Sequence, residues 1–419
     1  MEFKEINNQY VFTFRKGDCS FFYNNTNGNI AIAKDFCYLE NKFYEPAKDL
    51  GVDIDEVDYE QLYLAVSESC NFNCKYCRQK RTHRLENMST DEIKVAIDVF
   101  YSVSKKPKSV VFFGGEPLLN IQGIQYAIDY IRSFDKDVAF SMVINGSLCD
   151  EKISHFFANN NVEVIVSVDG PADIHNKARL FNRGNGTYEN AIQGYRNLKN
   201  AGCITGITTV IGPHNENCFN RLIEWAIQLQ PNSLGFCLPH GNYNNFAMKV
   251  SSFDKIHENM IKAYDILHQN GIHLVQVEQK IKSFILGCSV PFECKACGKR
   301  IVACKDNKFG ICEGAITKHE RFYENIGQFI NMVREYKKTS PFLIPSCQSC
   351  IAYRICGGSC VYDKIVRYGR ADIPDKCRCG LNTRIAERAM NHIVNGFPSQ
   401  NDYHILTPEE RIELLERLV

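Results

Sequence analysis

Three closely spaced cysteines, Cys70, Cys74 and Cys77, give the clearest chemical signal in the chain, and they directly follow an apolar, strand-like run. Thiolates at this Cys-x3-Cys-x2-Cys spacing can hold three irons of a cubane [4Fe–4S] cluster, since thiolate is the ligand that such clusters take. The fourth iron then has no protein ligand and can bind a chelating small molecule, which indicates a catalytic cluster. Buried structural thiols or a zinc knuckle are the alternatives, but a structural zinc ion takes four ligands and only His83 lies nearby.

A second group of cysteines lies further along the chain, where eleven of the twenty fall within residues 288–379. The strongest pattern there is Cys347-x2-Cys350-x5-Cys356-x3-Cys360. Reduced thiols at such spacing are typical of a metal site, either iron–sulfur or, as the alternative, a zinc ribbon. Further candidate ligands flank this pattern: Cys297, Cys312 and Cys377.

Polar residues follow three of the predicted strands, at the edge where parallel α/β barrels gather their functional groups. Gly114-Gly115-Glu116-Pro117 offers bare backbone to a ligand and a carboxylate that can accept a hydrogen bond from an ammonium group. Asn145 follows the next strand, where a simple turn is also a good interpretation. Ser167 and Asp169 can hold ligand hydroxyl groups, and Arg179 can pair with a carboxylate. Ordinary turns and a surface arginine are the alternatives.

The elements that must position these residues alternate between strand and helix from residue 59 onward. The sequence predicts strands at residues 61–66, 109–113, 138–144, 162–168, 204–211 and 233–238. It predicts helices at residues 90–104, 121–133, 152–160, 188–200, 218–230 and 252–270. Repeated βα units with apolar strands indicate a parallel sheet covered by helices. Six units are too few for a closed eight-stranded barrel, so the predicted fold class is α/β with a partial (β/α)6 barrel.

The bulk composition excludes several classes of protein. A length of 419 residues suggests two or three domains. A net charge of +1 gives no field for nucleic acid. No 18-residue apolar stretch or signal-peptide pattern is present, so we expect no membrane association. Twenty cysteines are expected to be reduced thiols or metal ligands, which favours a cytoplasmic protein.

The three-cysteine motif together with Gly114-Gly115-Glu116-Pro117 resembles the radical S-adenosylmethionine (SAM) superfamily, and Ser167-x-Asp169-Gly170-Pro171 with His175 and Arg179 resembles its peptide- and protein-modifying branch. The resemblance implies that SAM binds the open iron and is cleaved to a 5′-deoxyadenosyl radical, which abstracts hydrogen from the substrate. It implies the following SAM-binding residues: Gly114, Gly115, Glu116, Pro117, Asn145, Ser167, Asp169 and Arg179.

The cysteine-rich region resembles the SPASM domain, a module with two auxiliary [4Fe–4S] clusters, so three clusters are expected in all. The resemblance assigns Cys294, Cys297, Cys312 and Cys360 to auxiliary cluster I. It assigns Cys347, Cys350, Cys356 and Cys377 to auxiliary cluster II. Cys288 competes with Cys294, and Cys379 competes with Cys377; if neither of the first pair reaches cluster I, that cluster has an open iron. Asn307 replaces the usual turn glycine, and Glu313 is a candidate general base where sulfatase-maturing relatives place an aspartate.

The leading functional hypothesis is an enzyme that installs a thioether or carbon–carbon crosslink in a ribosomally made precursor peptide. An external electron donor such as flavodoxin or ferredoxin would reduce the SAM cluster. A sulfatase-type maturase that oxidises a protein Cys or Ser to formylglycine is the alternative. An iron–sulfur scaffold or electron-transfer protein without SAM chemistry is an alternative of another class.

We expect four segments along the chain. Residues 1–58 form a small β-rich segment that either binds a leader peptide by strand addition or has a structural role, and residues 59–285 form the partial barrel. Residues 286–380 form the SPASM domain, and residues 381–419 form a helical tail whose capping box joins Thr407 to Glu410. The cysteines that match no ligand pattern are interpreted as ordinary buried residues: Cys19, Cys37, Cys149, Cys203, Cys218, Cys237 and Cys304.

Overall fold

The computed structural model describes residues 1–47, 50–77, 86–238, 252–318, 321–397 and 403–417 of the chain. His83 lies outside the described residues. Within the described part, no helix is both long and apolar enough to cross a membrane.

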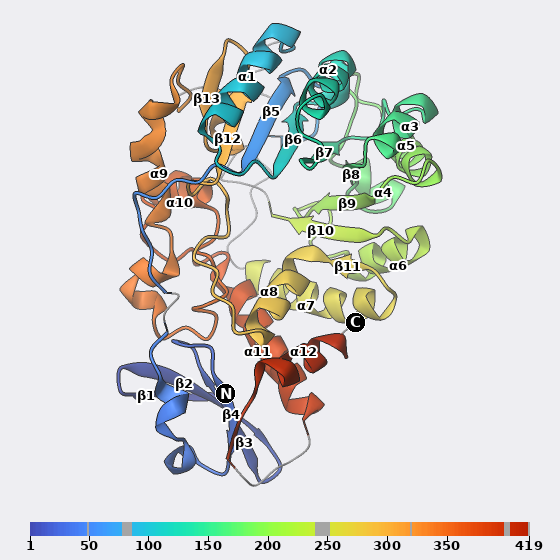
Figure 1. Cartoon of the computed structure of the whole chain (residues 1–419). Helices are drawn as coiled ribbons and strands as arrows, with labels where there is room; N and C mark the ends of the chain where they lie inside the picture. The colour runs from blue at the N-terminus through green and yellow to red at the C-terminus, as the bar shows by residue number, and fades with distance from the viewer. Residues whose placement is uncertain (48–49, 78–85, 239–251, 319–320, 398–402, 418–419) are drawn as a thin grey trace.

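The main sheet curves into an arc with helices on its outer face (Figure 1). Its nine strands, in spatial order, are β11 (His273–Leu274), β10 (Ser233–Cys237), β9 (Thr205–Val210), β8 (Val162–Ser167), β7 (Ala139–Ile144), β6 (Ser109–Gly114), β5 (Gln61–Ser67), β12 (Arg300–Cys304) and β13 (Lys308–Gly310). The neighbours from β11 to β12 pair in parallel, and β12 pairs antiparallel with β13. This confirms the open α/β sheet and all six predicted barrel strands.

The described helices of the barrel include six that lie close to their predicted positions and two, α4 and α8, that were not predicted. They are α1 (Thr90–Val103), α2 (Ile121–Arg132), α3 (Glu151–Asn159), α4 (Ala172–His175), α5 (Tyr188–Asn200), α6 (Phe219–Leu229), α7 (Phe253–Gln269) and α8 (Val275–Ile285). Helix α1 begins with a capping box, in which Ser89 and Glu92 each accept a hydrogen bond from the other's backbone. Apolar faces of these helices pack on strands such as β8, whose Val162, Val164 and Val166 are buried.

The N-terminal segment forms a separate antiparallel sheet in the order β1 (Glu2–Ile6), β2 (Gln9–Lys16), β3 (Cys19–Asn24), β4 (Ile30–Ala33) and β14 (His404–Ile405). The N-terminal residues are therefore β-rich, as predicted. Its last strand, β14, comes from the C-terminal tail, which the sequence predicts as helical. The tail also contains α12 (Pro408–Glu416), whose capping box joins Thr407 to Glu410 as predicted.

The cysteine-rich region is joined to the barrel rather than separate from it, because its hairpin β12–β13 continues the main sheet through β5. The turn of this hairpin contains Asp306 and Asn307, both with positive φ, so Asn307 does replace the turn glycine. The region also holds α9 (Ile330–Lys337) and α10 (Val361–Tyr368), and α11 (Cys379–Gly396) packs against α7 and α8.

Candidate functional site

The three-cysteine loop follows β5 and packs on the segment after α4. The backbone amides of Asn73 and Lys75 donate to the carbonyls of Leu180 and Ala178, at 2.6 and 2.8 Å. Burial raises the pKa of the Cys70 thiol to about 11 and that of Cys74 to about 12. Thiolates at these positions therefore need a bound cation to stabilise them, which suits metal ligands.

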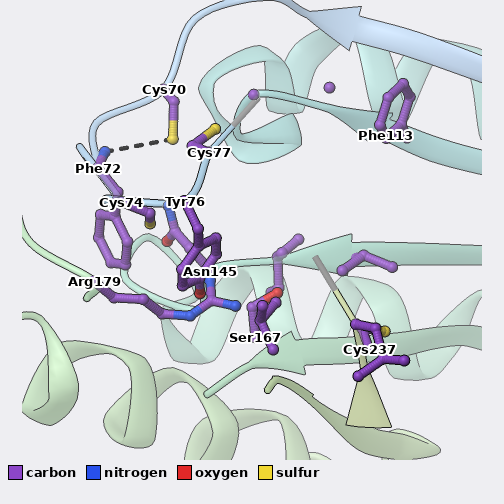
Figure 2. A pocket seen from close by; sticks show the side chains of 16 residues that line it. Cys70, Phe72, Cys74, Tyr76, Cys77, Phe113, Asn145, Ser167, Arg179 and Cys237 are labelled. Carbon is purple, nitrogen blue, oxygen red and sulfur yellow. Dashed lines mark hydrogen bonds between the residues drawn. The ribbon is translucent and has the colours of Figure 1, made fainter. Parts of the chain in front are cut away.

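A cavity of about 290 Å³ lies between this loop and the carboxyl ends of the barrel strands (Figure 2). Its lining includes all three cysteines of the loop and Gly114, Gly115, Asn145, Ser167 and Arg179. The cavity wall also contains apolar side chains from the inner face of the sheet, namely Phe113, Val143 and Val210. The sequence-predicted residues thus converge on one cavity, except Glu116, Pro117 and Asp169.

Two glycines let β6 run close against the loop. Gly114 has φ +147°, and a Cβ there would lie 2.0 Å from the Ser67 carbonyl oxygen. A Cβ on Gly115 would lie 2.4 Å from the Ser69 carbonyl oxygen. Any side chain would displace the backbone that leads into Cys70, so the glycines serve the approach of two chain segments as well as access for a ligand.

Glu116 does not face the cavity, which corrects the prediction that its side chain is available to a ligand ammonium group. The residue is 1% exposed, and its carboxylate oxygens accept hydrogen bonds from the backbone amides of Leu118 (3.1 Å) and Asn145 (2.7 Å). Burial raises the pKa of its carboxyl to about 7. Pro117 is likewise buried, at the start of a 3₁₀ turn. Glu116 therefore fastens the β6 rim to the β7 rim.

Asp169 is also turned away from the cavity, so the prediction that it holds ligand hydroxyls needs correction. Its fully buried carboxylate contacts Nε of Arg179 and Nε2 of His214, each at 3.1 Å, and accepts a 2.6 Å hydrogen bond from the Tyr76 hydroxyl. Burial alone would raise the pKa of Asp169, but Arg179 and His214 outweigh it and hold that pKa below its usual range. Asp169 thus fixes the position of Arg179.

Arg179 is 7% exposed and reaches into the cavity beside Ser167 (Figure 2). Its guanidinium lies 5.4 Å from the centre of the Tyr76 ring. Within the described residues, its two terminal nitrogens donate no hydrogen bond, so they are free to bind an anionic group. Asn145 is held in the rim by a 2.8 Å hydrogen bond to Asn71.

Residues Cys294, Cys297, Cys312 and Cys360 lie together in the cysteine-rich region. Burial is the main reason that the pKa values of Cys297 and Cys360 are raised. The neighbouring Cys294 and Cys312 raise both pKa values further, so they lie close to Cys297 and Cys360. Cys288 is exposed, and it contributes to the pKa of Arg411 rather than to that of a cysteine in this set. The structure therefore groups Cys294, rather than Cys288, with the other three.

The other predicted cysteine set requires a correction. After burial, the thiolates of Cys356, Cys347 and Cys350 raise the pKa of Cys379 to about 12, so Cys379 lies beside these three. Asn382, one turn along α11, donates to Cys356 Sγ at 3.3 Å. Cys377 is buried, and after burial and Asp375 it raises the pKa of Tyr368. The neighbours of Cys379 therefore favour it over Cys377 as the fourth member of the set.

Glu313, the candidate general base, is held in an ion pair with Arg300. Its carboxylate accepts a 2.6 Å hydrogen bond from Arg300, whose guanidinium stacks 3.9 Å from the centre of the Tyr63 ring. Glu313 is not among the residues that line the cavity. Its position beside Cys312 makes it part of the surroundings of the first auxiliary cysteine set.

Comparison with known proteins identifies the barrel. Residues 64–226 match the radical SAM superfamily. The chain therefore contains a radical SAM domain. It is 25% identical over 363 residues to the radical SAM cyclopropyl synthase TigE of Paramaledivibacter caminithermalis, covering 80% of this chain and 75% of TigE. It is 23% identical over 326 residues to a cysteine-type anaerobic sulfatase-maturating enzyme of Clostridium perfringens, covering 71% of this chain and 88% of that enzyme.

Solved structures share the fold. Native anSMEcpe with bound AdoMet has a TM-score of 0.68 at 20% identity, over 80% of this chain and 100% of that chain. Streptococcus suis SuiB bound to its precursor peptide SuiA has a TM-score of 0.54 at 13% identity, over 77% of this chain and 76% of that chain.

A radical SAM enzyme binds SAM and a [4Fe–4S] cluster, and the residues present fit both groups. Within the described residues, no three Cys, His, Asp or Glu side chains converge closely enough to hold a single ion. A cubane instead places each thiolate on a different iron. Three cysteines border a cavity that also contains a buried arginine with free donors, and this combination suits a cluster beside a ligand with a carboxylate.

Two cysteines depart from the prediction that they are ordinary buried residues. Cys19, Cys149, Cys203 and Cys304 are buried as expected, and Cys218 is half-buried. Cys37 and Cys237 are exposed, and Cys237 lines the cavity.

Sequence reasoning also missed Tyr76 and His214, which contact Asp169. Position 76, between two cluster cysteines, was a signal that could have been used for Tyr76.

Proposed function

We propose that this radical SAM enzyme modifies a ribosomally made precursor peptide, abstracting hydrogen from carbon and installing a thioether or carbon–carbon crosslink. The observation that carries the proposal is the pairing of the SAM cavity with two separate sets of four cysteines packed beside the barrel. Forming such a crosslink removes two hydrogen atoms from the peptide, so a surplus electron must leave the site. Two auxiliary [4Fe–4S] clusters, one at Cys294, Cys297, Cys312 and Cys360 and one at Cys347, Cys350, Cys356 and Cys379, would accept it.

Comparisons support a peptide substrate. SuiB has been solved with its precursor peptide SuiA, and anSMEcpe with a peptide called Cp18Cys. Among the residues that the structure describes, β1 is an outer strand of the N-terminal sheet and pairs on one side only, with β2. An extended leader peptide can bind such an edge by adding a strand.

We retain residues 1–58, 59–285, 286–380 and 381–419 as proposed segments.

In the proposed mechanism, bound SAM and its cluster supply a 5′-deoxyadenosyl radical that abstracts hydrogen from the substrate. Cys70, Cys74 and Cys77 would hold the cluster, and the terminal nitrogens of Arg179 would bind the SAM carboxylate. Asp169 and Tyr76 fix the guanidinium in place. Gly114 and Gly115 present backbone to the ligand, and Asn145 and Ser167 contribute polar groups at the neighbouring strand ends.

Three further residues support the arrangement. Glu116 keeps the β6 and β7 rims in register, and the apolar wall of Phe113 and Val143 excludes water from the reacting carbon. An external one-electron donor of the flavodoxin or ferredoxin class would reduce the SAM cluster. Twenty free cysteines suit a reducing cytoplasm.

A sulfatase-maturase activity is the second candidate, because anSMEcpe matches with a higher TM-score than SuiB, 0.68 against 0.54. The ion pair between Glu313 and Arg300 weighs against it if a free carboxylate base is required next to the cluster.

The test is anaerobic incubation of the enzyme with SAM, dithionite and either of two peptides: a precursor peptide encoded beside the enzyme's gene, or a sulfatase peptide that contains the target cysteine. The proposal expects 5′-deoxyadenosine and a precursor peptide that is lighter by two hydrogen atoms. Conversion of the sulfatase cysteine to an aldehyde would instead establish the second candidate. The Cys70→Ala variant is the control that should produce neither.

A further inference from the structure

Cys237 is an exposed thiol inside the SAM cavity, at the carboxyl end of β10. Figure 2 shows it across the cavity from Cys70 and Cys77, on the inner face of the sheet. Its Sγ lies 3.2 Å from the Thr208 hydroxyl of β9. No iron–sulfur assignment uses this cysteine, and the proposed function gives it no role.

The surroundings make Cys237 chemically distinct. The wall beside it is apolar, with Val210 and Leu238 in the same lining. Besides the three cluster cysteines, the cavity lining contains the phenolic O–H group of Tyr76, whose hydroxyl already donates to Asp169 at 2.6 Å. Among the described lining residues, Cys237 therefore offers the accessible X–H bond that is weaker than a typical C–H bond.

A second observation indicates that this cavity can bind an anionic ligand. Arg179 is buried, its side chain reaches into the same cavity, and its terminal nitrogens make no hydrogen bond with described residues. An anionic ligand bound there lies between the cysteine loop and β10. Any carbon radical formed next to it is therefore generated in the cavity that Cys237 lines.

We propose that Cys237 donates a hydrogen atom to a carbon radical in this cavity, an inference that rests on the proposed function. The S–H bond breaks and a C–H bond forms, leaving a radical on Sγ. That radical regains an electron from the one-electron donor that also reduces the cluster, and a proton from water. The peptide then undergoes no net oxidation, because the hydrogen atom removed from its carbon is replaced. The enzyme therefore has a second, redox-neutral reaction in addition to crosslinking. The configuration of the carbon is inverted where the new hydrogen atom arrives on the opposite face.

The experiment exploits exchange of the thiol proton with solvent. The anaerobic holoenzyme is incubated with SAM and dithionite in D₂O without peptide, so that the 5′ carbon of the SAM fragment is the available carbon radical. The proposal expects wild-type enzyme to release 5′-deoxyadenosine carrying one deuterium. The Cys237→Ala and Cys237→Ser variants should lose this label, scored as the deuterated fraction of the product formed rather than as a rate.

Serine is the decisive substitution, because it keeps the contact with Thr208 but has a strong O–H bond. Retention of the label in Cys237→Ser would overturn the proposal and leave only a packing role. The matched control is Cys37→Ala, an exposed cysteine of the N-terminal segment, which should keep the label. Absence of any 5′-deoxyadenosine from wild type refutes the proposed function, whereas unlabelled 5′-deoxyadenosine from wild type refutes the role of Cys237 alone.

Alkylation gives a readout that does not depend on turnover. Iodoacetamide should label Cys237 in the anaerobic holoenzyme, and S-adenosylhomocysteine should slow this labelling without protecting Cys37. Equal labelling of Cys237 with and without the nucleoside would overturn its placement beside the ligand.

Discussion

Replacing Cys379 with alanine should remove iron from the protein, whereas replacing Cys377 should not. Burial and the neighbouring Cys356, Cys347 and Cys350 thiolates raise the pKa of Cys379, whereas Cys377 lies beside Tyr368. The two cysteines are only two positions apart, so a pattern of spacing cannot separate them. Cys379 begins α11 whereas Cys377 precedes it, and the two have different neighbours.

The magnitude follows from cluster stoichiometry. Three [4Fe–4S] clusters hold about twelve irons, and each thiolate binds one of them. Cys379→Ala should therefore contain between about eight and about eleven irons, depending on whether the whole cluster or only the iron without a ligand is lost. Cys377→Ala should retain about twelve, since it removes one buried Sγ at a cost in unfolding free energy of about 1 kcal/mol.

The assay is iron and sulfide content of anaerobically purified and reconstituted protein, with electron paramagnetic resonance of the reduced state. A Cys70/Cys74/Cys77→Ala variant provides the reference spectrum of the auxiliary clusters alone. If Cys377→Ala loses iron while Cys379→Ala keeps it, the assignment drawn from these contacts is wrong. Zinc in place of iron in the triple variant would refute the auxiliary clusters altogether.

Three further outcomes can be measured. Cys294→Ala should lose iron and Cys288→Ala should not, because only Cys294 lies with its proposed partners; equal iron content in both variants would contradict this. Asp169→Asn should weaken SAM binding by about 10- to 100-fold, since a charge-assisted contact that positions Arg179 is worth about 1.5–3 kcal/mol; isothermal titration calorimetry would show an unchanged Kd if the contact is unimportant. Burial raises the pKa of Glu116 from 4.5 to about 7, so the stability that its protonated form contributes is complete below pH 4.5 and is lost as the pH rises through 7. The difference corresponds to about 3 kcal/mol, and the Tm of chelator-treated wild type should fall relative to that of Glu116→Gln as the pH rises from about 4.5 to about 7.5. A pH-independent Tm difference would contradict the buried, proton-binding state.

The barrel was predictable because its signals are local. Each of the six strands is an apolar run followed by an amphipathic helix, and the helix starts carry capping residues such as Ser89. The additions at the sheet edges were not predictable in the same way. Strand β12 joins β5 from about 240 residues away in sequence, and the two-residue β14 is too short to leave a periodic pattern.

The cavity residues were predictable as a set, but two of the individual roles were not. Motifs place Glu116 and Asp169 at strand ends without saying which way each carboxylate points. Asp169 is turned inward by Tyr76 and His214, which lie 93 and 45 positions away in the chain. A buried carboxylate needs such partners, and they can be identified only once the fold brings them together.

Cys237 shows a signal that sequence reasoning could have used. In β10, Leu234 and Phe236 are buried toward the helices, so the two-residue period of a strand places Gly235 and Cys237 on the opposite face. In a fully packed parallel sheet that face would also be core, and a small buried cysteine would need no explanation. In a partial barrel the inner face near the carboxyl ends of the strands borders the ligand cavity instead. A cysteine that points to the inner face at the last position of a barrel strand is therefore better interpreted as a reactive group than as a core residue. This does not apply to Cys203, because it precedes a strand and so lies at the amino end of the sheet.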